Sequence, residues 1–126
     1  MSGKMKTKHD FYELFSKQVE FQQSLLKKKG EEVILPIDSV DWFSYHMQAM
    51  TEELGEVLKA DKRWKTHRNS RYEREEKLDE LADVFITAMN LCIYSDFDYE
   101  DISEAISKKI EENIKRLELK GGKQSE

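Results

Sequence analysis

Long segments of this chain lack the residues that most often interrupt helices. One proline and five glycines occur among its 126 residues, and both residue types commonly end a helix. Apolar residues recur at spacings of three and four, which places them on one side of an α-helix. Strand-like alternation is missing. The pattern therefore predicts an all-α fold, a four-helix bundle.

Local signals place the ends of the four expected helices. A cationic run before Gly30 suits a helix C-terminus, Asp38 or Ser39 can cap the second helix, and Asp98 can cap the fourth. We expect one catalytic domain over residues 9–120, with flexible tails at 1–8 and 121–126. The helices are predicted at about 9–28, 39–65, 72–94 and 99–119.

Composition narrows the partners and the compartment. The formal net charge of −5 argues against nucleic acid as a bulk electrostatic partner. No apolar stretch approaches the roughly 20 residues of a membrane span, so no membrane partner is expected. Cys92 is the single cysteine, which excludes an intrachain disulfide and favours a reduced, cytoplasmic setting.

Two pairs of carboxylates suggest a metal site. Glu53 and Glu56 form one pair, Glu80 and Asp83 the other, and residues three apart share a helix face. The short connection between their helices favours antiparallel packing, which would bring four carboxylates together. Because like charges repel at such distances, the arrangement implies a cation, and hard oxygen ligands suit Mg²⁺ or Mn²⁺.

An ordinary solvated surface is the alternative, because acidic residues on helices usually face water. Two further features favour a site. Glu80 and Asp83 directly precede the most apolar stretch of the chain. Gly55 lies inside a helix, where glycine costs about 1 kcal/mol relative to alanine, and could allow the close approach of a neighbouring helix or a ligand.

The carboxylate pattern resembles the signature of the all-α nucleoside triphosphate pyrophosphohydrolases. This superfamily includes MazG-type enzymes, dimeric dUTPases and dCTP pyrophosphatases, and the resemblance covers about residues 10–117. It implies Mg²⁺-dependent cleavage of a (deoxy)nucleoside triphosphate, such as dUTP, dCTP or a non-standard nucleotide, to the monophosphate and pyrophosphate. Such enzymes cleanse the nucleotide pool. Glu53, Glu56, Glu80 and Asp83 would hold the metal, and Glu53 would orient or deprotonate the attacking water.

A polar set on the fourth predicted helix strengthens the resemblance. Lys109, Asn113 and Arg116 have spacings of four and three, so they share one face. Dimeric dUTPases carry a similar set that contacts the substrate's phosphates. An ordinary solvated face is the alternative, since other lysines lie nearby.

Residues that would recognise the base are less sharply marked. Relatives use aromatic and histidine side chains for this purpose, and dimeric dUTPases use a glutamine and a nearby asparagine of the first helix. This chain has no asparagine in its first helix, which departs from the dUTP pattern. Asn90 could instead form a helix–helix hydrogen bond, and Trp42 is expected in the core. The candidates for base binding are Gln18, Gln22, His46, Trp64 and Asn90.

Two other functional classes are compatible with a helical chain that carries paired carboxylates. A di-iron bundle needs Glu-x-x-His, and no glutamate here has histidine three residues later. The alternative hypothesis is a non-catalytic helical interaction module that retains a vestigial acidic metal site. Relatives assemble into oligomers, so a homodimer or homotetramer is expected, with a nucleoside triphosphate as substrate.

Overall fold

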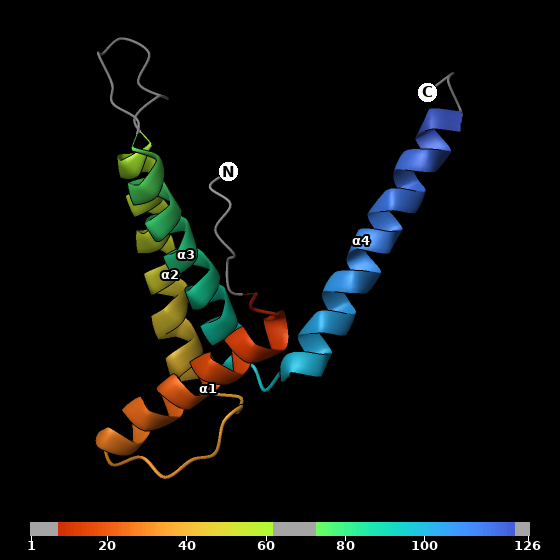
Figure 1. The fold of residues 1–126 in the computed structure, drawn as a ribbon. Coiled ribbons are helices and arrows are strands. Elements are labelled where there is room, and N and C mark those ends of the chain that lie inside the picture. Colours follow the sequence, from red (N-terminus) through yellow and green to blue (C-terminus); the bar gives the residue numbers. More distant parts are fainter. Residues whose placement is uncertain (1–7, 62–72, 123–126) are drawn as a thin grey trace.

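The fold consists of helices throughout its described parts. The computed structural model describes residues 8–61 and 73–122, and within these ranges it contains no β-strand. This confirms the predicted all-α class with four helices (Figure 1). No helix in these two ranges is both long and apolar enough to span a membrane. The elements are α1 (Phe11–Lys28), α2 (Val40–Ala60), α3 (Arg74–Ile93) and α4 (Tyr99–Gly122).

Three of the helices are capped at their N-termini by side chains. The Asp10 carboxylate accepts a hydrogen bond from the Glu13 amide at 2.9 Å, and Asp98 does the same for Asp101 at 2.9 Å. Ser39 rather than Asp38 caps α2, accepting from the Trp42 amide at 3.2 Å. Such bonds satisfy amides that have no partner within the helix.

The helix ends differ from the predicted ones around the connection between α2 and α3. Helix α2 ends at Ala60, with Asp61 as its C-cap, instead of continuing to Lys65. The predicted start of the third helix, Tyr72, lies outside the described residues, and α3 begins at Arg74 in the part that is described.

The core lies at one end of the α2–α3 pair. Helices α2 and α3 run antiparallel, and α1 crosses the end formed by the start of α2 and the end of α3 (Figure 1). The buried cluster contains Phe15, Leu26, Leu35, Ile93 and Tyr94. Burial of these apolar side chains supplies the main driving force for packing.

The segment between α1 and α2 is tied to this end by hydrogen bonds. The Gln23 side chain donates to the Val33 carbonyl at 2.6 Å and accepts from the Leu35 amide at 3.0 Å. The amide of Ser39 donates to the Tyr94 carbonyl at 3.0 Å. The Gln23 bonds hold the segment against α1, and the Ser39 bond holds the start of α2 against the end of α3.

Helix α4 diverges from the other three helices (Figure 1). Its first turn packs on the start of α1, where the Tyr99 ring lies 5.8 Å from Phe11 and 5.1 Å from Tyr12. From 104 to 120 every side chain is exposed. The apolar face of α4 is therefore uncovered within the described chain; its members include Ile106, Ile110, Ile114 and Leu117.

Candidate active site

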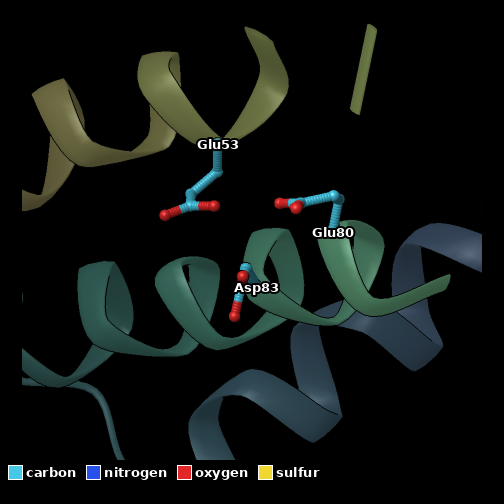
Figure 2. A group of neighbouring side chains, drawn as sticks. All are labelled: Glu53, Glu80 and Asp83. Carbon is cyan, nitrogen blue, oxygen red and sulfur yellow. The ribbon is translucent and has the colours of Figure 1, made fainter. Parts of the chain in front are cut away.

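Three of the four predicted carboxylates converge between α2 and α3. Glu53 of α2 and Glu80 and Asp83 of α3 each offer an oxygen, and these oxygens all lie within 4.8 Å of one another. Figure 2 shows Glu53 reaching from α2 toward α3, whose side chains Glu80 and Asp83 project from neighbouring turns. The i, i+3 spacing and the antiparallel packing together produce this cluster, as the sequence predicts.

An ion pair joins α2 and α3 at the end of these helices that lies away from the buried core. Lys77, in the first turns of α3, donates to the carboxylate of Asp61, the C-cap of α2, at 2.9 Å. Both side chains are largely shielded from solvent. This contact ties the two helix ends together beside the carboxylates.

The carboxylates destabilise one another's charges. Partial burial raises the pKa of Glu53, and the charges of Asp83 and Glu56 raise it further. Partial burial also raises the pKa of Glu80, with added contributions from Glu56 and Asp83. Neither residue, nor Asp83, has an ion-pair partner among the described residues. Within residues 8–61 and 73–122 the cluster thus concentrates negative charge without a paired cation.

Glu56 lies at the edge of the cluster. Its charge acts on both Glu53 and Glu80, but it is exposed and does not belong to the group within 4.8 Å. Gly55 does not serve the close approach of a neighbouring helix, because a Cβ at this position would meet no atom within 4 Å. No close approach in the described chain requires that glycine.

The donor set fits a hard divalent cation. Mg²⁺ is commonly held by one or two carboxylates, with water and substrate phosphates completing its ligands. Carboxylates from two helices meet this requirement, and the exposure of Asp83 leaves the cluster open to a ligand. The sequence prediction of a Mg²⁺ or Mn²⁺ site is thus chemically consistent with the geometry.

The predicted phosphate-binding set shares one face of α4, away from the carboxylates. Arg116 donates to the Asn113 side-chain oxygen at 2.9 Å, and both residues are exposed, as is Lys109. Since α4 diverges from α2 and α3 (Figure 1), the set does not lie beside the carboxylates of the same chain.

Three of the predicted base-binding residues form a hydrogen-bonded chain. Gln18 donates to the Asn90 side-chain oxygen at 2.8 Å, and the Asn90 amide nitrogen lies 3.5 Å from Nδ1 of His46. Burial lowers the pKa of His46, which favours the neutral ring. Gln22 instead accepts a 2.7 Å hydrogen bond from Tyr94, and Trp64 lies outside the described residues.

A cavity adjoins this network. Its volume is about 630 Å³, within the range of small-molecule sites. Trp42 is half-buried and stacks on Tyr94 of the core, as predicted, but it also lines the cavity. Tyr45 and Lys29 also line the cavity and were not predicted from the sequence, although Tyr45 lies one turn from Trp42 on the same helix. The lining residues include Gln22, Lys29, Asp41, Trp42, Tyr45 and His46.

The cavity and the carboxylates lie along one face of α2. Trp42, His46 and Glu53 follow one another at helical spacings that keep them on the same side. His46 and Glu53 are two turns apart, which corresponds to about 10 Å along the helix.

Comparison with known proteins identifies the family. No curated protein and no solved structure matches this chain. Residues 6–110, most of the chain, match the family described as phosphoribosyl-ATP pyrophosphohydrolase. This match confirms the resemblance to the all-α MazG-like superfamily and, in general terms, the prediction of a nucleotide pyrophosphohydrolase. The chain belongs to the phosphoribosyl-ATP pyrophosphohydrolase family.

Proposed function

We propose that this protein is a Mg²⁺-dependent enzyme that cleaves a nucleoside triphosphate chain to a monophosphate and pyrophosphate. The convergence of Glu53, Glu80 and Asp83 within 4.8 Å carries the proposal. The family's name points to phosphoribosyl-ATP, whereas the superfamily resemblance points to dUTP, dCTP or non-standard nucleotides. All of these compounds contain a triphosphate group, which would bind at the carboxylates.

The chain's residues have distinct roles in this proposal. Bound Mg²⁺, held by Glu53, Glu80 and Asp83 with Glu56 at the edge, would offset phosphate charge and make water more acidic. Glu53 takes a proton from the attacking water as the general base. The water oxygen bonds to the α-phosphorus, and the bond to the bridging oxygen breaks, releasing pyrophosphate.

Lys109, Asn113 and Arg116 bind the phosphates in this proposal, and a second copy of the chain supplies them. Helix α4 leads away from the carboxylates of its own chain (Figure 1). Its uncovered apolar face, with Ile110 about half exposed at 52%, supports association with another copy. A homodimer or homotetramer would thereby complete the site.

A substrate panel tests the proposal. Phosphoribosyl-ATP, dUTP, dCTP, the common nucleoside triphosphates and several damaged nucleotides are incubated with the protein, and pyrophosphate and monophosphate are measured. We expect turnover of at least one compound with Mg²⁺ and none with excess EDTA. Glu53→Gln should abolish it, whereas Glu118→Gln, the same change on exposed α4, should not.

Two outcomes would refute the proposal. The first is the absence of turnover for every compound with the helical content intact, which would favour the non-catalytic helical module. The second is full turnover in EDTA or in Glu53→Gln.

A further inference from the structure

The cavity between α1 and α2 contains a buried polar atom without a partner. His46 is 6% exposed, and its Nε2 forms no hydrogen bond with an atom of the described residues. A buried nitrogen in this state is costly unless a ligand satisfies it. His46 also lines the cavity, so a bound molecule is the natural source of the missing partner.

The neighbouring amides determine which ring nitrogen carries the proton. Gln18 donates to the Asn90 oxygen, which turns the Asn90 nitrogen toward Nδ1 of His46. An amide nitrogen can only donate, so Nδ1 must accept. A neutral imidazole that accepts at Nδ1 has its hydrogen on Nε2. The free atom is therefore an N–H donor.

A second donor points to the same kind of ligand. The Gln22 side-chain oxygen is occupied by the Tyr94 hydroxyl, which leaves its amide nitrogen as the group available to the cavity. Both His46 and Gln22 would thus donate to a ligand. A molecule bound here needs acceptor atoms along the edge that faces Gln22 of α1 and His46 of α2.

The cavity wall suits a flat ring. Trp42 lies against Tyr94 at 5.7 Å and 22°, and Lys29 Nζ lies 5.6 Å from the centre of the Trp42 ring. Lys29 is a flexible, exposed side chain, so a heteroaromatic ring can take its place by stacking on the indole. The Tyr45 ring, 60% exposed and edge-on to His46 at 4.9 Å, forms another part of the cavity wall.

We propose that this cavity binds a planar nitrogen heterocycle whose ring-nitrogen or carbonyl acceptor takes a hydrogen bond from His46 Nε2. The identification of that ring as the substrate's nucleobase rests on the proposed function, through the shared face of α2 that leads from His46 to Glu53. Gln18 and Asn90 are positioning residues that keep the proton on Nε2.

A pair of fragments tests the hydrogen bond without metal, phosphate or turnover. Benzimidazole and indole have nearly the same shape, but only benzimidazole carries a ring-nitrogen acceptor. Their affinities are measured by NMR titration of the Trp42 indole N–H, in a Trp64→Phe protein where Trp42 is the one tryptophan left. We expect benzimidazole to bind roughly tenfold more tightly.

Substitutions of His46 separate recognition from structural support. His46→Phe keeps a ring and removes the donor, so it should erase the preference. It also removes the Nδ1 acceptor of Asn90, so circular dichroism first confirms that the variant keeps its helical content. His46→Gln keeps a donor and should retain most of the preference. Equal affinities in the parent protein, no binding of either fragment, or a preference that survives His46→Phe would overturn the proposal. So would loss of the preference in His46→Gln.

A kinetic measurement tests the assignment to the base. With the best substrate of the panel, His46→Phe should raise KM by roughly tenfold and leave kcat nearly unchanged, since Glu53 and its neighbours are intact. An unchanged KM would show that the cavity takes rings but does not read the base. If the parent protein has no turnover, the proposed function fails while the fragment result stands.

Discussion

The carboxylate oxygens of Glu53 and Asp83 lie within 4.8 Å of each other, although the two residues come from different helices. Partial burial raises the pKa of Glu53, and repulsion by the charge of Asp83 raises it further. This repulsion between carboxylates destabilises the folded protein, and such an arrangement is typical of sites that bind a cation.

Removing one charge from the cluster should stabilise the metal-free protein. In EDTA, Glu80→Gln is expected to melt at a higher temperature than the parent, because Glu80 is repelled by Glu56, Asp83 and Glu53. Millimolar Mg²⁺ should raise the melting temperature of the parent and much less that of Glu80→Gln. Glu118→Gln serves as the matched control on α4. The metal assignment would be contradicted if neither Mg²⁺ nor Mn²⁺ changed the melting temperature of the parent protein.

The central and peripheral carboxylates should differ in their effect on catalysis. Asp83→Asn removes a member of the converging cluster and should lower kcat/KM by more than about 100-fold. Glu56→Gln changes a residue at the edge and should cost about 10- to 100-fold. The comparison is made at saturating Mg²⁺ with circular dichroism confirming helical content. Equal losses would mean that Glu56 joins the cluster when a metal binds.

Two inactive variants should restore activity when mixed. Glu53→Gln retains Arg116, and Arg116→Ala retains the carboxylates. A mixed oligomer therefore contains a site that combines the intact carboxylates of one copy with the intact α4 of the other. If α4 of one copy serves the carboxylates of another, mixing and brief partial unfolding should return roughly a quarter of parent activity. Light scattering should report a dimer or larger. Arg116→Ala with full activity, or no recovery in a mixed oligomer, would remove α4 from the partner's site.

The stability of the fold should depend on pH through His46. Burial lowers its pKa below 6.5 in the folded protein, so the unfolded chain binds a proton first as the pH falls. The free energy of unfolding therefore decreases once the pH drops below about 6.5, until the folded pKa is passed. Chemical denaturation at several pH values should show a smaller acid loss in His46→Phe than in the parent. Parallel curves would indicate that His46 titrates normally.

The Tyr94 hydroxyl should contribute measurably to stability. It donates to Gln22 at 2.7 Å in the buried core, and burial is the main cause that raises its pKa to about 12. Tyr94→Phe leaves the Gln22 oxygen without this donor and should cost about 1–2 kcal/mol of unfolding free energy. Tyr12→Phe, at a position 58% exposed, is the control and should change little. Urea denaturation measures both.

The sequence predicts the carboxylate cluster well because its cause is local. Spacing of three residues and a short antiparallel connection are enough to bring Glu53, Glu80 and Asp83 together. The same reasoning overextends α2 beyond Ala60, because helical periodicity alone does not mark where packing stops.

Long-range contacts were beyond prediction from the sequence. The proton position on His46 depends on Gln18 and Asn90, which lie on different helices. The apolar spacing of Ile106 and Ile110 predicts a helix with a face to cover, but it does not reveal that α4 diverges from the rest. Such features follow from tertiary packing, which periodicity does not encode.

Hydrolysis in ¹⁸O-labelled water tests the central claim most directly. The best substrate of the panel is turned over with Mg²⁺, and mass spectrometry locates the label in the products. Attack at the α-phosphorus beside Glu53, Glu80 and Asp83 predicts one labelled oxygen in the nucleoside monophosphate and none in pyrophosphate. Label in pyrophosphate, or release of orthophosphate with a nucleoside diphosphate, would contradict the account.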